Sequence, residues 1–304
     1  MRVVIVGLGV QGRKRRAVAG GDVVATVDPT VGEADYRRLS DVSEDRYDAA
    51  LLCTPDGAKP ALIEALLVGG KHVLVEKPLL AGEATLKRFS RLAEERRAVC
   101  YTAYNHRFEP HWARLAAVLK AGALGRIYHA RFFYGNGTAR LVRDSAWRDQ
   151  GSGVIHDLGS HLLDACRFWF PAIGGGARLQ AADRFENRAP DHAIFTLEGP
   201  PAIEVELSLL SWRNDFTADV YGELGSAHIR SLCKWGPTTL TLRTRVLPSG
   251  RPLEETETLT QDDPTWVAEY AHFKALCATG GPSGFDNDIW IGRTLDALAH
   301  EAAA

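Results

Sequence analysis

Three glycines near the amino terminus have the spacing of a turn that binds phosphates. Gly7, Gly9 and Gly12 form the pattern G-x-G-x-x-G. In a dinucleotide-binding turn the first glycine allows the tight bend, the second lets the backbone approach a pyrophosphate, and the third lets helix and strand pack closely. The N–H groups at the start of the following helix, with the positive end of its dipole, then face the phosphates.

The flanking residues supply the rest of this fingerprint. Apolar, β-branched runs over residues 2–6 and 22–27 predict buried strands on either side of a helix-like stretch. The second run ends at Asp28, 21 positions after Gly7, where a carboxylate would hold the adenosine ribose hydroxyls. This order of elements predicts dinucleotide binding, and the alternative is a glycine-rich turn in another kind of α/β protein.

Three further residues have the chemistry of proton transfer. Asp157 and His161 are spaced i, i+4 in a segment, residues 151–170, that is predicted to contain one strong helix, so they share a helix face. A nearby carboxylate can fix the tautomer of an imidazole and raise its basicity. Lys77 follows an expected strand, and its ammonium can orient a hydroxyl and stabilise charge on the oxygen. The alternatives are a hydrogen-bonded pair on a helix surface and an ordinary strand end.

The elements that must position these residues alternate between strands and helices in the first third of the chain. Strands are expected at residues 2–6, 22–27, 47–53, 72–76 and 99–104, and helices at 13–19, 59–67 and 83–97. Such alternation with short connections predicts an α/β Rossmann domain with a doubly wound parallel sheet. Ligands bind such sheets at the carboxyl ends of the strands, where the glycine turn, Asp28 and Lys77 fall.

From about Leu124 the pattern changes to strands with few helices between them. Several segments alternate apolar and polar residues, as residues 203–209 do, which predicts a large, mainly antiparallel sheet with one covered face. Strand-like segments cover residues 126–134, 179–185, 192–197, 202–212, 217–224, 227–232, 238–246 and 255–259, and helices are expected at 266–278 and 286–300. We therefore expect a Rossmann domain over residues 1–122, followed by an α+β domain with an open-faced sheet over residues 123–304.

The composition argues against several classes of function. The 304 residues carry 36 basic and 38 acidic side chains, a formal net charge of −2, so nothing favours nucleic acid or an anionic membrane as partner. A strand begins almost at Met1, so we expect no signal peptide, and no apolar run is long enough for a membrane span. The five cysteines form no C-x-x-C pair and no cluster has metal-ligand spacing, which predicts reduced thiols, no metal and a cytoplasmic location.

Four motifs in this order resemble one known family. They are the glycine fingerprint, residues 76–78 (Glu-Lys-Pro), residues 104–108 (Tyr-Asn-His-Arg-Phe) and residues 151–161 (Gly-Ser-Gly-Val-Ile-His-Asp-Leu-Gly-Ser-His). Over nearly its whole length the chain resembles the glucose-fructose oxidoreductase / inositol dehydrogenase / rhizopine-catabolism (Gfo/Idh/MocA) oxidoreductase family. The resemblance implies Lys77, Asp157 and His161 as the catalytic residues, and whether the lysine or the histidine accepts the proton varies across such enzymes. It also makes Pro78 a candidate for a cis peptide bond.

The resemblance and the residue pattern together give a set of expected ligand contacts. The cofactor contacts are expected from Gly7, Leu8, Gly9, Val10, Gln11, Gly12, Asp28, Thr54, Pro55, Glu76, Lys77 and Asn105. The substrate contacts are expected from Lys77, Arg107, Trp147, Arg148, His156, Asp157 and His161. Alternatively, Asn105 and Arg107 brace the domain junction, the pair at 147–148 packs between domains, and His156 is a buried histidine with satisfied hydrogen bonds. The basic run at residues 13–16 is expected to be a solvated helix face.

The resemblance implies an NAD-dependent oxidoreductase that acts on a secondary hydroxyl or ketone of a sugar, a nucleotide-linked sugar or a cyclitol. NAD is expected rather than NADP, because Asp28 would repel a 2′-phosphate and no cation follows it directly. One alternative is a reductase of the same fold for a non-sugar carbonyl or imine, and another is a non-catalytic sensor. A nucleotide-linked sugar needs a basic site, for which Arg140, Arg143 and Arg148 are the clustered candidates. Residues 56–60 lack the histidine that many members carry after the Thr-Pro pair.

The sheet of the second domain is expected to mediate self-association. Few helices follow residue 124, and the alternation could place Leu207, Leu209, Val220 and Leu240 on an outward face. An uncovered apolar face is costly in a monomer, and symmetric pairing covers it. Related enzymes imply a homodimer or homotetramer through this sheet; the alternative is that the last two helices cover it.

Overall fold

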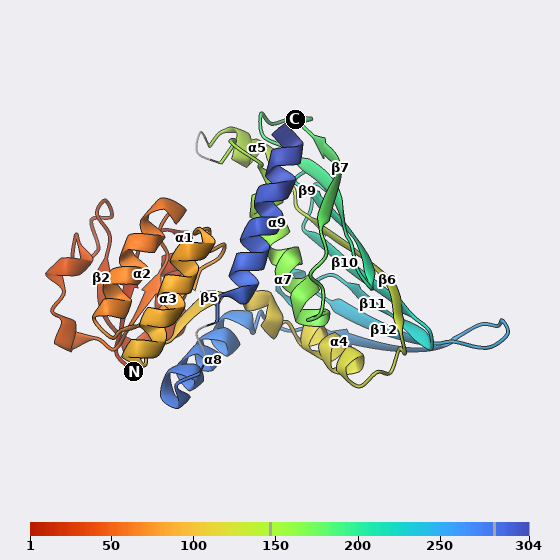
Figure 1. Ribbon diagram of the computed structural model, residues 1–304, viewed down its shortest axis with the longest axis horizontal. Helices are drawn as coiled ribbons and strands as arrows, with labels where there is room; N and C mark the ends of the chain where they lie inside the picture. Colours follow the sequence, from red (N-terminus) through yellow and green to blue (C-terminus); the bar gives the residue numbers. More distant parts are fainter. Residues whose placement is uncertain (146–147, 282–283, 304) are drawn as a thin grey trace. The chain divides into compact units, whose positions relative to one another are not determined.

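The structure is a computed structural model that describes residues 1–145, 148–281 and 284–303 (Figure 1). The chain forms two compact units: unit 1 is Met1–Asn105 with Pro264–Gly292, and unit 2 is His106–Asp263 with Arg293–Ala304. This division differs from the expected boundary at residues 122/123. Helix α4 (Pro110–Lys120) belongs to unit 2, because its Trp112 packs on Trp169 of that unit with ring centroids 4.7 Å apart.

Unit 1 is built on a five-stranded parallel sheet with the strand order β2-β1-β3-β4-β5. Its strands are β1 (Val3–Val6), β2 (Val23–Val27), β3 (Ala49–Leu52), β4 (His72–Glu76) and β5 (Cys100–Ala103). Its main helices are α1 (Val10–Ala19), α2 (Lys59–Val68), α3 (Glu83–Arg96), α8 (Thr265–Thr279) and the first part of α9 (Asp286–Ala303). The predicted doubly wound sheet is confirmed.

The two faces of this sheet have separate cores, because side chains alternate along each strand. On one face, Val4 packs in a cluster with Ile63 of α2 and Phe89 of α3. On the other face, Ile5 packs in a cluster with Phe273 of α8. These five side chains and their neighbours on β1 are buried, which fixes the strand ends that carry the predicted cofactor site.

Unit 2 is built on an eight-stranded mixed sheet with the order β13-β12-β11-β10-β6-β9-β8-β7. Its strands are β6 (Ile127–Gly135), β7 (Ala177–Asp183), β8 (His192–Leu197), β9 (Ala202–Ser208), β10 (Asp215–Gly222), β11 (Gly225–Arg230), β12 (Thr238–Thr244) and β13 (Leu253–Leu259). Strands β6 and β9 pair in parallel, and the other neighbouring strands pair antiparallel. The predicted α+β domain is confirmed.

The helices of unit 2 lie along one face of its sheet (Figure 1). Besides α4 they are α5 (Ala139–Arg143), α6 (Val154–Asp157), α7 (Gly159–Trp169) and the last part of α9. In the part of the chain that the structure describes, no helix combines the length and apolar character needed to cross a lipid bilayer.

The prediction that apolar side chains face outward from this sheet is wrong. Leu207, Leu209, Val220 and Leu240 are at most 2% exposed, and a side chain on Gly159 of α7 would meet Leu207 at 3.2 Å. These residues therefore lie on the helix-covered face, while the open face carries polar side chains on neighbouring strands, Arg131 and Glu204 among them, ion-paired at 3.0 Å. Alternation gives two faces but does not say which one the helices cover. The expectation of self-association through this sheet is therefore no longer supported by an exposed apolar face.

Candidate active site

The carboxyl ends of the strands in unit 1 bring predicted cofactor residues to one edge of the sheet. Asp28 follows β2, the glycine turn follows β1, Thr54 comes just after β3 and Lys77 follows β4. Because the strand order is β2-β1-β3-β4, the four groups lie along the edge in this order. Neighbouring strands are about 4.8 Å apart, so the outer two strands are separated by about 14 Å.

At two of the three glycines of the turn, other protein atoms leave no room for a side chain, whereas the third faces open space. Gly7 has a φ of +94°, and a Cβ there would lie 2.5 Å from the carbonyl oxygen of Cys53. A Cβ on Gly12 would lie 1.8 Å from the carbonyl oxygen of Gly7, whereas a Cβ on Gly9 would meet no atom within 4 Å. The fold thus requires glycine at 7 and 12, while at Gly9 the open space is where a ligand can approach the backbone.

Asp28 ties the glycine turn to the loop after β2. One carboxylate oxygen accepts from the Leu8 N–H at 2.8 Å, and the other accepts from the Thr30 and Val31 N–H groups at 2.8 and 2.9 Å. Burial raises the pKa of Asp28, but these backbone hydrogen bonds outweigh it and lower the pKa to about 2. The carboxylate is therefore ionised and fixed, and the oxygen that faces Leu8 keeps a second lone pair for a ribose hydroxyl.

Other predicted cofactor residues surround this turn. The Thr54 hydroxyl is buried and has no hydrogen-bond partner among the described residues. Native structures leave few buried polar atoms unsatisfied, and a bound ligand is one way to satisfy this one. Leu8 is buried, whereas Val10 and Gln11 in the first turn of α1 are exposed. The open Gly9, the ionised Asp28 and the Thr54 hydroxyl together fit a bound dinucleotide.

The turn at residues 76–78 is anchored by a buried arginine. Arg15 of α1 is 1% exposed, and its Nε donates to the Glu76 carboxylate at 2.7 Å. Its Nη2 lies 2.6 Å from the carboxylate of Glu269 on α8. The expectation that residues 13–16 form a solvated face is therefore wrong for Arg15, because one face of α1 packs on α8. The peptide bond between Lys77 and Pro78 is cis, as the resemblance implied.

Two residues of the 104–108 motif make polar side-chain contacts within their own units. The Asn105 amide donates to the Thr265 hydroxyl at the start of α8 at 2.7 Å, within unit 1. The Arg107 guanidinium forms a two-pronged ion pair with the buried Asp164 of α7, with Nε 2.9 Å from Oδ2, within unit 2. Because each contact lies within one unit, neither supports bracing of the domain junction, and contact of either residue with a ligand stays a prediction.

The predicted helix that carries Asp157 and His161 is interrupted. Helix α6 ends at Asp157 and α7 begins at Gly159, so the two side chains are on consecutive helices rather than on one continuous helix face. The Asp157 carboxylate accepts from Nη2 of Arg148 at 3.1 Å. His156 hydrogen-bonds to Ser152. Trp147, also predicted to contact substrate, lies outside the described residues.

His161 is surrounded in unit 2 by residues that were not among the predicted site residues. Its imidazole stacks on that of the buried His106, with ring centroids 4.2 Å apart and planes 28° apart. The Lys234 ammonium lies 2.9 Å from His106 Nε2 and 3.4 Å from the Tyr134 hydroxyl, and burial raises the pKa of Tyr134. His106 stands inside a motif already noted, between two predicted site residues, but Lys234 follows it by 128 positions and carries no local signal.

The three arginines considered for a diphosphate each have a carboxylate partner. Arg140 lies 3.5 Å from Glu186, and Arg143 lies 3.9 Å from Asp144. Arg148 is the partner of Asp157 described above. The structure therefore gives no separate support for a nucleotide-linked substrate.

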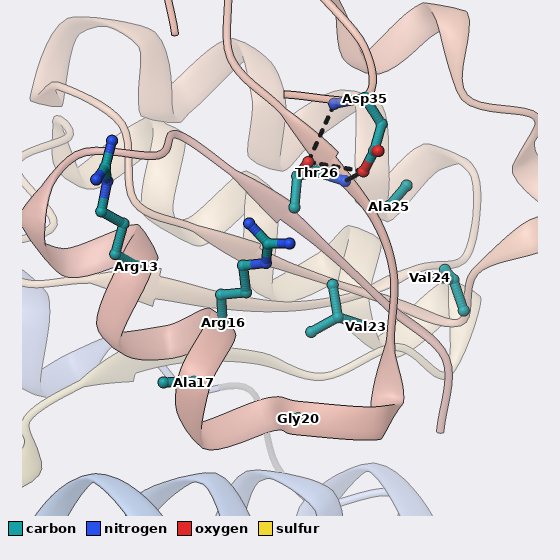
Figure 2. Close-up of a pocket in the computed structure, with 9 residues that line it drawn as sticks. All are labelled: Arg13, Arg16, Ala17, Gly20, Val23, Val24, Ala25, Thr26 and Asp35. Atoms are coloured by element: carbon teal, nitrogen blue, oxygen red, sulfur yellow. Dashed lines mark hydrogen bonds between the residues drawn. The ribbon is translucent and has the colours of Figure 1, made fainter. Parts of the chain in front are cut away.

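A groove on unit 1 is lined by a different set of residues. It runs between α1 and β2, with Arg13 and Arg16 on the helix side (Figure 2). Opposite them, the carboxylate of Asp35 accepts from the N–H and the hydroxyl of Thr26 at 2.8 and 2.7 Å. None of its lining residues belongs to the predicted site.

Comparison with known proteins identifies the class of each part of the chain. Residues 1–104 match the model of an oxidoreductase family with an NAD-binding Rossmann fold, and residues 112–228 match the GFO/IDH/MocA C-terminal domain. The chain therefore belongs to the Gfo/Idh/MocA oxidoreductase family, and its unit 1 carries an NAD-binding domain.

The individual proteins that the chain matches are distant relatives. The oxidoreductase YdgJ of Escherichia coli is 30% identical over 152 residues, which cover 47% of this chain and 43% of the relative. The D-xylose 1-dehydrogenase [NADP(+)] of Haloarcula marismortui is 29% identical over 194 residues, which cover 59% of this chain and 52% of the relative. The chain thus spans about half the length of these curated relatives. Levoglucosan dehydrogenase in complex with NADH shares the fold, with a TM-score of 0.86 and 18% identity over 100% of this chain and 97% of that chain.

Proposed function

We propose that the chain is an NAD-dependent oxidoreductase for a secondary hydroxyl, or the matching ketone, of a sugar, a nucleotide-linked sugar or a cyclitol. The observation that carries this proposal is the order of groups along the edge of the unit 1 sheet: an ionised acid, an open glycine turn, an orphan hydroxyl and a lysine. The names of two similar proteins, a D-xylose 1-dehydrogenase and a levoglucosan dehydrogenase, support this substrate class.

The proposed roles follow from the chemistry of the side chains. NAD, when bound, supplies the hydride acceptor or donor. As an ammonium, Lys77 orients the substrate hydroxyl and stabilises charge on its oxygen, and the hydroxyl proton then passes to His161. If Lys77 is instead the neutral amine, it can take the hydroxyl proton itself. Asp157, held by Arg148, orients the reacting groups, and the stacked ring of His106 restricts rotation of the His161 imidazole.

A substrate panel tests the proposal directly. The purified protein is incubated with NAD⁺ and sugars, nucleotide sugars or inositols, and the absorbance of NADH is followed. The reverse reaction is followed with NADH and ketones, carbonyl compounds outside the sugars, and imines. Turnover of a polyol is the expected result. Turnover confined to non-sugar carbonyls or imines would contradict the substrate class, and NAD⁺ binding without turnover of any compound would contradict an enzymatic function.

NAD⁺ is expected to bind about tenfold or more tightly than NADP⁺. The ionised Asp28 would lie near a 2′-phosphate, and like charges at such distances repel by about 1–4 kcal/mol near a protein surface. Two arginines of this part of unit 1 already have partners. Arg13 lies 3.0 Å from Glu33, and Arg37 donates to the Val31 carbonyl at 2.8 Å and to the Asp28 carbonyl at 3.5 Å. Calorimetric titration with both oxidised cofactors measures the ratio, and tighter binding of NADP⁺ would reverse the assignment.

His161→Ala is expected to lower kcat by about two to four powers of ten, the range for a positioned acid–base group, while NAD⁺ affinity is retained. Asp157→Asn should cost less, because an amide of the same shape keeps part of the orienting role. His129→Ala serves as the control, since His129 is exposed on β6 and stacks on Tyr221 away from this cluster. Near-normal turnover of His161→Ala would exclude the imidazole from the chemistry.

A further inference from the structure

Lys59 carries a buried ammonium directly beneath the turn from which Lys77 projects. Its side chain is 3% exposed, and it is the first residue of α2. Its Nζ donates to the carbonyl oxygens of Glu76 and Pro78 at 2.7 and 2.8 Å, and to the carboxylate of Asp56 at 2.6 Å. All three donors of the ammonium are therefore used, and two of the acceptors are the carbonyl groups on either side of Lys77.

A buried lysine at the start of a helix is unfavourable unless its hydrogen bonds serve the structure around it. A cation in the first turn of a helix opposes the helix dipole, and burial of an ammonium costs several kcal/mol before its partners are counted. Asp56 offsets part of this cost, although its carboxylate is half exposed. A neutral side chain of similar length would fill the same space, but it would remove the Lys59 donor from both carbonyl groups. The hydrogen bonds to the carbonyl groups of Glu76 and Pro78 therefore explain why a lysine is buried at this position.

We propose that Lys59 is a positioning residue for Lys77: it ties the carbonyl groups of the preceding and the following residue to α2, and so fixes the direction in which the Lys77 ammonium leaves the sheet. The inference rests on the proposed function, in which Lys77 acts on the substrate. The Glu76 side chain is held separately by Arg15 of α1. The main chain on both sides of Lys77 and the side chain before it are thus anchored to two different helices.

Loss of the two hydrogen bonds from Lys59 to these carbonyl groups is expected to change the rate of reaction rather than the binding of ligands. Lys59→Met keeps the length of the side chain and removes its donors, so the turn gains freedom around Lys77. A misplacement of about 1 Å in a reacting group costs about a hundredfold in rate, and we expect kcat to fall by about ten- to a hundredfold while KM and NAD⁺ affinity stay unchanged. The hydrogen bonds of Asp28 and the close approaches at Gly7 and Gly12 involve no atom of Lys59.

The matched control is Lys71→Met. The Lys71 ammonium likewise donates to two backbone carbonyl groups, those of Glu44 at 2.6 Å and Tyr47 at 3.1 Å, on another side of unit 1. Its loss removes the same kind of interaction without touching the turn at residues 76–78, so kcat should stay at the wild-type value. A similar fall in kcat for both variants would overturn the proposal, because it would show a general effect of lost stability.

A double-mutant cycle separates positioning from an independent role. If Lys59 acts through Lys77, adding Lys59→Met to Lys77→Ala should cost little further activity, since coupled residues are not additive. A full multiplicative loss would contradict the proposal. If Lys59→Met does not fold, Lys59→Arg replaces it in the cycle, because the planar guanidinium retains the charge but cannot reproduce the three bonds of a tetrahedral ammonium.

Amide exchange tests the tie without reference to activity. In the NAD⁺-bound protein, the N–H groups of Lys77 and Leu79 should exchange faster in Lys59→Met than in wild type or Lys71→Met. Unchanged exchange would overturn the inference even for an active enzyme. If the wild-type protein turns over no panel compound, the proposed function fails. Faster exchange in Lys59→Met would then show that Lys59 holds the backbone around Lys77, but that this does not serve catalysis.

Discussion

Lys77→Ala should lower kcat by about two to four powers of ten, with NAD⁺ affinity retained. Lys77 follows β4 at the edge of the sheet that also carries the glycine turn and Asp28. Its neighbours in the chain are held by Arg15 and Lys59, so the ammonium projects from a fixed backbone and needs little reorganisation to meet charge that develops on a substrate oxygen. Alanine removes the charge and both possible roles of the residue, as electrostatic stabiliser and as proton acceptor.

The measurement is steady-state kinetics with the panel substrate that the wild-type protein turns over fastest, together with an NAD⁺ titration. Lys87→Ala is the control, because Lys87 is 60% exposed on α3 and pairs only locally with Glu83 at 2.6 Å. Near-normal kcat in Lys77→Ala would remove the residue from the mechanism. A loss of NAD⁺ affinity equal to the loss of rate would assign Lys77 to cofactor binding instead.

The NAD-binding domain and the strand ends that carry the proposed cofactor contacts could be predicted from the sequence because their signals are local. Each glycine, the acid after β2 and the lysine after β4 has a position set by an adjacent buried strand, and buried parallel strands are recognisable as apolar β-branched runs. The steric reasons found for Gly7 and Gly12 are those expected of the fingerprint. Asp28 shows the limit of this reasoning, since its four hydrogen bonds to nearby loops depend on how those loops close.

The remaining features depend on tertiary packing that local patterns do not encode. Four consecutive basic residues begin within α1, and only the position of α8 decides that Arg15 is the buried one. Strand alternation defined two sheet faces in unit 2 but placed Leu207 and its neighbours on the wrong one. The contact between His106 and Lys234 joins residues 128 positions apart, for which the sequence offers no period or spacing.

Arg15→Met should lower the free energy of unfolding by about 3–5 kcal/mol, the cost of removing one partner from a buried ion pair. The guanidinium is 1% exposed and forms ion pairs with two carboxylates, Glu76 at 12% exposure and Glu269 at 0%. Burial lowers the pKa of Arg15, but the two carboxylates outweigh this and raise it above the usual arginine value, so the cation is permanent. Without it, both carboxylates keep their desolvation cost and lose their main compensation.

Chemical denaturation of Arg15→Met and of Arg13→Met measures this effect against a matched exposed pair. Arg13 is 61% exposed and lies 3.0 Å from the half-exposed Glu33, so its loss should cost no more than about 1 kcal/mol. In Arg15→Met the two carboxyl groups should have raised pKa values, and protonation then favours the folded state. The loss in free energy of unfolding relative to the wild-type protein should be largest near neutral pH and should shrink as the pH falls toward about 5. Adding Glu269→Gln to Arg15→Met should recover part of the loss. Equal costs for the two arginine variants, or a deficit that grows on acidification, would show that the buried network does not stabilise unit 1.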